Sequence, residues 1–152
     1  MEKTNSKQTE PLLNLLASLV EVNHAVIVEC YLSALQETVF SNRAEVRPSM
    51  LKQIASDEAE MLLSYLKQPM FSVAERGSQL HQAGLSETVV LRLGHVTRLF
   101  FLSRLESNQI AQMLETVHAY QEAVFHGFAQ GFEQFHLREM ERTRNSFQRS
   151  NS

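Results

Sequence analysis

The sequence predicts an all-α protein with a single domain. Only 5 glycines and 3 prolines occur in 152 residues, so few positions break a helix. Apolar residues recur at steps of three and four, the spacing of a helix with one buried face. The chain is also long enough to bury one continuous core. These three observations favour helices packed around a common interior.

The first apolar stretch runs from Pro11 to Phe40, and its leucines and valines keep a helical spacing. We expect two helices here that meet near Asn23. The run Ala-Val-Ile-Val at 25–28 would suit a strand, but no turn signal flanks it. Its surroundings favour helix.

A polar connector at 41–49 precedes the next helix, which begins at Pro48 or Ser49 and stops before Pro69. The acidic run at 56–60 is expected to form the solvated side of this helix. The opposite, broad apolar face contains Leu51, Ile54, Met61, Leu62 and Tyr65.

Ser72 and Glu75 have the spacing of a capping box, which predicts a short helix that ends at Gly84. His81 then lies in its last turn. Ser86 is expected to cap a following central helix, which should be buried around much of its circumference. Its apolar residues are Val89, Val90, Leu93, Val96, Phe100 and Phe101.

The last predicted helix runs from about Gln109 towards residue 145 without a proline. At about 1.5 Å per residue it spans on the order of 50 Å, more than a compact domain of this size. We expect the first half of its stripe to pack on the core, and the second half to contact the same helix of a homodimer partner. Gly127 and Gly131 would let another helix approach closely. The stripe contains Ile110, Leu114, Val117, Val124, Phe128, Phe132 and Phe135.

Charge and cysteine usage narrow the class of protein. The net charge is −3, with 14 basic and 17 acidic residues, so we expect no nucleic-acid partner and no anionic membrane partner. No apolar run approaches the roughly 20 residues that span a bilayer. Cys30 is the single cysteine, expected to be a small buried thiol, and the amino terminus lacks a secretory signal. A cytoplasmic location is predicted.

Residues typical of catalysis are missing from the sequence patterns. We find no nucleophile elbow, no phosphate-binding glycine loop and no carboxylate pair in apolar surroundings. His118, Glu122 and His126 share one face of the last helix. Residues eight apart on a helix are about 12 Å from each other, too far for one metal ion, and we interpret the trio as an exposed or interfacial strip. A sensor or binding module is predicted rather than an enzyme.

The segment HQAGLSETVVLRLGHVTRLFFLSRL at 81–105 resembles bacterial globin-coupled sensors, in which a helix ends in a histidine and Gly-Leu before a long apolar helix. It is also similar to the amino-terminal domains of RsbR-type stressosome regulators. The resemblance implies a globin-like sensor domain over 1–145, with long carboxy-terminal helices that form a dimer bundle. It further implies that 146–152 begin a linker to an output domain, and that STAS-domain proteins and a kinase are partners.

The same resemblance implies a site for haem b that senses oxygen or another diatomic gas. His81 would be the proximal iron ligand and Tyr31 the distal hydrogen-bond donor, and signalling would pass from His81 through the last helices. The walls would come from Phe40, Leu93, Val96 and Phe100.

Alternatives to this assignment stay open. His81 could be a solvated histidine near a helix end, and the ligand could be His24, His95 or His118; for His95, burial against a carbonyl is the favoured interpretation. The alternative function is a non-haem interaction and dimerisation module of the same regulator type, which senses a partner or an unknown ligand.

Overall fold

The computed structural model describes residues 2–42, 47–69 and 73–150, and these contain helices and no strand. The predicted all-α class is confirmed. One 3-10 helix, η1, covers Ser107–Gln109. The α-helices are α1 Glu2–Val22, α2 His24–Asn42, α3 Pro48–Lys67, α4 Ala74–Gln82, α5 Glu87–Leu102 and α6 Ile110–Ser150.

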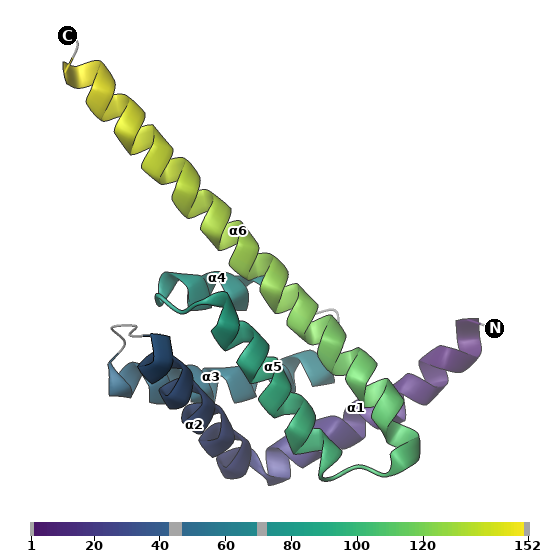
Figure 1. Ribbon diagram of the computed structural model, residues 1–152. Coiled ribbons are helices and arrows are strands. Elements are labelled where there is room, and N and C mark those ends of the chain that lie inside the picture. The colour runs from purple at the N-terminus through teal and green to yellow at the C-terminus, as the bar shows by residue number, and fades with distance from the viewer. Residues whose placement is uncertain (1, 43–46, 70–72, 151–152) are drawn as a thin grey trace.

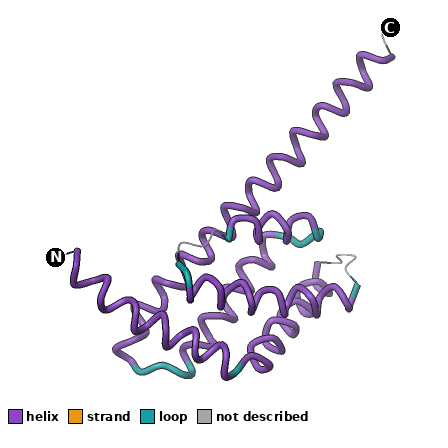
Figure 2. Tube along the Cα trace, turned by 180° about the vertical axis from the view of Figure 1, so that it is seen from behind, coloured by secondary structure: helices purple, strands orange, loops and turns teal. Residues whose placement is uncertain are grey.

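The helices form a body from which α6 projects. Figure 1 shows α2, α3 and α5 gathered with the carboxy-terminal part of α1, while α4 lies beside the middle of α6. Figure 2, from behind, shows the second half of α6 leaving the body as a single rod. We call residues 132–149 the projecting half of α6. The helix continues through residue 145 to Ser150, so no break in α6 marks the predicted linker boundary.

The junction of α1 and α2 lies at Asn23, as predicted. The two axes are bent by 80°, and the Asn23 side-chain amide donates to the Leu19 carbonyl at 2.9 Å. α1 begins at Glu2, so Pro11 lies inside the helix and does not start it. The polar residues before Pro11 extend the helix beyond the apolar stretch.

The predicted stops of α3 and α4 are confirmed. α3 ends at Lys67, before Pro69. After α4, Gly84 has a φ of +84°, a conformation that glycine adopts without steric cost. The Leu85 amide donates to the Leu80 carbonyl at 3.2 Å and the Gly84 amide to the His81 carbonyl at 3.0 Å, the two bonds of a Schellman motif. The proposed capping residue Ser72 lies outside the described residues.

The first half of α6 closes the core, and the predicted burial is confirmed for Val117, Val124 and Phe128 but is wrong for Leu114. Leu114 is 38% exposed, because the face that meets α5 and the rest of the body lies on the side of Met113 and Tyr120. Residues of α6 that are buried in the core are Met113, Val117, Tyr120, Val124 and Phe128.

Two glycines let α4 and α6 touch backbone to backbone. A Cβ atom at Gly127 would overlap the Ala74 carbonyl, and one at Gly77 would overlap the Val124 carbonyl. No side chain fits between the helices at this crossing, so the prediction that small residues on α6 admit a close neighbour is confirmed for Gly127. That neighbour is α4 of the same chain.

Candidate functional site

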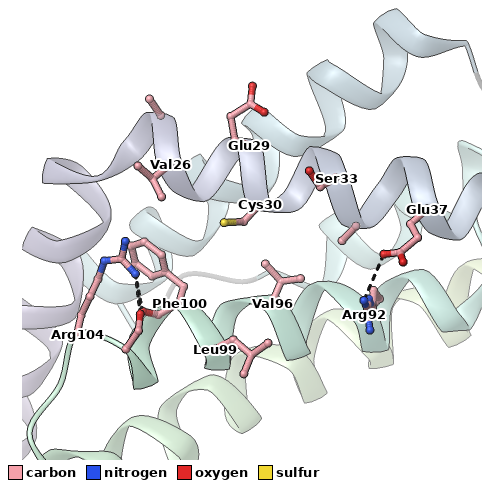
Figure 3. A pocket seen from close by; sticks show the side chains of 13 residues that line it. Val26, Glu29, Cys30, Ser33, Glu37, Arg92, Val96, Leu99, Phe100 and Arg104 are labelled. Carbon is pink, nitrogen blue, oxygen red and sulfur yellow. Dashed lines mark hydrogen bonds and ion pairs between the residues drawn. The ribbon is translucent and has the colours of Figure 1, made fainter.

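A concave surface lies between α2 and α5, and we call it the α2/α5 groove (Figure 3). It has a volume of about 720 Å³. Val96 and Phe100, two predicted pocket residues, form part of its wall, and Cys30 faces it from α2. The remaining lining residues are Ala25, Val26, Glu29, Ser33, Ala34, Glu37, Arg92, Leu99, Ser103 and Arg104.

Charged side chains lie at the two ends of the α2/α5 groove. Arg92 on α5 bridges to Glu37 on α2 at 3.3 Å. At the other end, the Arg104 guanidinium lies 4.1 Å from the centroid of the Phe100 ring and donates to the Phe100 carbonyl at 3.0 Å. Between them the surface is mainly apolar (Figure 3). The groove therefore suits an elongated apolar group.

The prediction that Cys30 is a buried thiol was wrong, because Cys30 is exposed. It lies next to Tyr31, and successive residues of a helix point in different directions. Tyr31 takes the core side of α2, which turns Cys30 towards the groove.

Tyr31 is fully buried and is not among the residues that line the α2/α5 groove. Its hydroxyl and the Thr97 hydroxyl of α5 are 2.6 Å apart, and Thr97 in turn donates to the Leu93 carbonyl at 2.9 Å. Burial raises the pKa of the Tyr31 phenol, and the nearby Glu58 carboxylate raises it further. The phenol is therefore a neutral partner that joins α2 to α5 inside the core.

His81 lies away from the α2/α5 groove. It is in the last turn of α4, and its ring faces the start of the projecting half of α6. Its ring meets three aromatic rings edge to face, with centroid distances of 5.2 Å to Phe128, 5.8 Å to Phe132 and 6.1 Å to Phe135. A separate cavity of about 480 Å³ adjoins it. The lining residues of that cavity are His81, Gln82, Gly84, Gly131, Phe132, Gln134, Phe135 and Arg138.

The residues predicted to hold haem do not meet at one cavity. His81 faces α6, Tyr31 bonds to Thr97 in the core, and Val96 with Phe100 lines the α2/α5 groove. Leu93 is buried beside a cleft of about 10 Å³, too small for a porphyrin. The side chain of Phe40 lies outside the described residues. This arrangement does not fit a haem group held by the predicted set.

The other histidines are exposed or partly exposed. His95 is exposed, so the expectation that it is buried against a carbonyl was wrong; it occupies the outer side of α5, whose inner side carries Gly94 and Leu93. His118 and Glu122 are about three-quarters exposed, and their side chains are 3.8 Å apart. His126 contacts Gln130 at 3.2 Å. Within the described residues, no group of three metal-binding side chains converges.

A buried polar cluster that the sequence interpretation missed joins α3, α4 and α6. Glu58 and Arg76 are each 3% exposed, and the Arg76 Nε donates to the Glu58 Oε2 at 3.1 Å. The Tyr120 hydroxyl donates to the Glu58 Oε1 at 2.9 Å, and Arg76 also donates to the Ile54 carbonyl at 2.8 Å. The expectation that 56–60 forms a solvated side was wrong at Glu58.

The spacing of Glu58 contained a signal for its burial. Glu58 stands four residues after Ile54 and four before Leu62, on the apolar face of α3. Arg76 stands three residues after Val73 and four before Leu80, both buried. An acidic and a basic residue that each interrupt an apolar face indicate a buried ion pair.

No single helix in the described ranges is both long and apolar enough to cross a bilayer. The segments Pro11–Val22 and His24–Val39 reach that length and apolarity only as a pair, across their 80° bend.

Comparison of the chain with protein families, with curated proteins and with solved structures finds no match. The likeness to RsbR-type regulators, and the STAS-domain and kinase partners that it implies, stay predictions.

Proposed function

We propose that this chain is a non-enzymatic signalling module that acts as a homodimer, with the projecting half of α6 as the contact between copies. The observation that carries the proposal is a row of large apolar side chains on a helix that has left the body. They range in exposure from 50% for Phe132 to 69% for Phe147, and together they are Phe132, Phe135, Leu137, Met140 and Phe147.

Exposed apolar side chains in such a row are unfavourable in water and are typical of a surface that another chain covers. The first half of α6 is already covered by the body, where Val117, Val124 and Phe128 are buried. The exposed row begins at that end of the body, where Phe132 and Phe135 still meet the His81 ring of α4, and continues beyond it. A second copy of α6 offers the same apolar surface and therefore suits the site.

The packing of α4 supports a signalling role. α4 is anchored to α3 through Arg76 and Glu58, while His81 at its other end packs on Phe132 at the base of the projecting half. A shift of α4 would therefore change the support of α6. A ligand in the α2/α5 groove would press on α5, which packs on α6, so both routes end at the proposed contact between copies.

The non-haem form of this function is the one that the geometry favours. The predicted ligand His81 packs on rings of α6, whereas the predicted distal Tyr31 is buried and bonded to Thr97, so the two residues do not face a common cavity. Protein purified with a haem supply is expected to show no Soret absorbance. A Soret band that is lost in His81→Ala but kept in His24→Ala, His95→Ala and His118→Ala would restore the haem-sensor assignment.

The dimer is tested by the mass of the particle in solution. The wild-type chain is expected to have twice the mass of one chain by light scattering coupled to gel filtration. The variant Met140→Glu/Phe147→Glu is expected to have the mass of one chain, because it places charges in the apolar row. As a matched control, Asn145→Glu adds a charge on the opposite side of the same helix and should stay dimeric.

Near-ultraviolet circular dichroism of the buried tyrosines reports whether the variants keep a folded body. A wild-type chain with the mass of one chain at all concentrations tested would overturn the proposal. So would a charged variant that remains dimeric with its body folded.

A further inference from the structure

The projecting half of α6 carries a short heptad pattern, and the inference drawn from it rests on the homodimer proposed above. His136, Met140, Thr143 and Phe147 follow one another at steps of four, three and four. They lie on one face of the helix, together with Glu139, Arg144 and Gln148. Such alternation of three and four is the seam of a coiled coil. Met140 and Phe147 take the a positions of this seam, and His136 and Thr143 the d positions.

The flanking positions distinguish the two ways in which the helices can pair. Glu139 stands at position g and Arg144 at position e. In a parallel coiled coil, a g residue faces the e residue of the next heptad on the other helix. Glu139 would then face Arg144 of the second copy, and the symmetric pair would form on the other side. Phe132 and Leu137 stand in the same relation, so this apolar pair would be covered as well.

Antiparallel pairing brings g next to g and e next to e. Glu139 would then lie on the side of its own counterpart, and Arg144 on the side of another Arg144, so like charges would repel. Glu139 and Arg144 form no ion pair within the described residues, and both side chains are exposed. Their charges therefore favour the parallel arrangement.

We propose that two copies pair through the projecting halves of α6 in parallel and in register, with their carboxy-terminal ends side by side. This arrangement places the α4 helices of both copies at the same end of the rod, because His81 packs on Phe132 at its base. A shift of α4 in either copy then acts on one common coiled coil, and a change of helix rotation or spacing reaches both carboxy-terminal ends together.

Disulfide cross-linking tests the orientation in the full chain, after the single cysteine is removed by Cys30→Ser. His136→Cys and Thr143→Cys each put a thiol at a d position. Parallel, in-register pairing predicts that each variant forms a disulfide with its own second copy under mild oxidation. Asn145→Cys, on the outer side of the same helix, is the matched control and should stay monomeric on a non-reducing gel.

A mixture of the His136→Cys and Thr143→Cys chains tests for the outcome that would contradict the proposal. One of the two chains carries a tag that changes its mass, so a disulfide between different chains can be told apart on the gel. A dominant disulfide between the two different chains would overturn the proposal, since parallel, in-register helices keep residue 136 of one copy about 10 Å along the axis from residue 143 of the other. An antiparallel pair can also cross-link itself at only one of these positions, the one nearest its axis.

Charge exchange gives a second readout that does not need cysteine. In parallel pairing, Arg144→Glu places two glutamates opposite each other on both sides and is expected to weaken the dimer several-fold. Glu139→Arg/Arg144→Glu should restore the dimer, because each pair is then reversed. Tighter association of Arg144→Glu alone would contradict the proposal, since it would mean that two arginines had faced each other.

The two proposals fail in different ways. If the wild-type chain is a monomer by light scattering, the homodimer itself is wrong. If it is a dimer but shows the mixed cross-link, only the parallel, in-register arrangement is wrong.

Discussion

Glu58 and Arg76 are the residues at which a single change should affect the core most. Both charges are removed from water, and the carboxylate oxygens are satisfied by Arg76 and by Tyr120. The pair is therefore a fixed connection between α3, α4 and α6. Removing one member of the pair should lower the free energy of unfolding strongly, because the other charge then stays buried without a partner.

Arg76→Met is expected to lower the free energy of unfolding by about 3 to 5 kcal/mol, because it leaves the Glu58 carboxylate buried without its cation. Urea unfolding followed by circular dichroism measures the change. Arg92→Met is the control, since it breaks the exposed pair with Glu37 and should cost no more than about 1 kcal/mol. Glu58→Gln/Arg76→Met removes both charges and should recover part of the loss. Equal losses for Arg76→Met and Arg92→Met would contradict this account.

The buried phenols predict a loss of stability in alkaline solution. Burial, and then the Glu58 carboxylate, raise the pKa values of Tyr31 and Tyr120 above the ordinary value, which is about 10 in an unfolded chain. Below that pH both states keep the proton and the stability is unaffected. Above it only the unfolded state ionises, so the free energy of unfolding should fall by about 1.4 kcal/mol per pH unit for each phenol.

Urea unfolding at several alkaline pH values measures this slope. Tyr31→Phe should show a shallower decline than the wild-type chain, because it has one buried phenol fewer. Tyrosinate absorbance gives the opposing outcome: ionisation of all three tyrosines at about pH 10 in a chain that is still folded would refute the raised pKa values.

The type of a residue predicted its burial poorly at positions where burial depends on the direction in which the side chain points. Cys30 and Tyr31 are neighbours in one apolar run, yet one faces the groove and the other the core. His95 follows the buried Gly94 and points outward. The rotation of a helix about its own axis depends on the elements that pack around it. The sequence of that helix alone does not predict this rotation. The haem pocket was predicted from residues whose helices turn them to different parts of the molecule.

Whole helices were predicted better than individual side chains. The break at Asn23, the stop after Lys67 and the left-handed Gly84 each depend on backbone chemistry within a few residues, and such signals are local. The exposure of Leu114 was predicted wrongly, because no local signal shows which side of α6 the body covers. Met113 and Tyr120 are buried because α5 and the rest of the body meet that side of the helix.

The contact between α4 and α6 predicts an unusual effect of alanine at a helical glycine. Alanine normally stabilises a helix by about 1 kcal/mol relative to glycine. At Gly127 its Cβ would overlap the Ala74 carbonyl, so α4 must move. Gly127→Ala is therefore expected to destabilise the chain by about 2 kcal/mol or more, as measured by urea unfolding.

Gly131→Ala is the matched control one turn further along α6. There the nearest atoms to an added Cβ are the Ser78 Oγ at 3.3 Å and the His81 Cβ at 3.4 Å, a distance that needs only small adjustments. The change should lie within about 1 kcal/mol of the wild-type chain. A stabilising Gly127→Ala would show that α4 does not pack on α6 at that residue.

The shape of the whole molecule separates a body with a buried core from a rod whose side chains are exposed. In the body, α6 is covered by α4 and α5, and most of its large apolar side chains are buried, with Leu114 as an exception. In the projecting half, all the side chains are exposed. A helix segment without tertiary contacts is only marginally stable in water, so the proposed homodimer predicts that pairing of the two copies orders the rod.

Amide hydrogen exchange should therefore divide α6 into two parts. Amides from Met113 to Phe128 are expected to be protected at all concentrations, because opening them disrupts the core. Amides from His136 to Arg149 should lose protection on dilution, and should exchange rapidly in Met140→Glu/Phe147→Glu at any concentration. Asn145→Glu should retain the pattern of the wild-type chain. Protection of the rod that is independent of concentration in a monomeric variant would mean that α6 is stable without a partner, and that its exposed apolar row has another role.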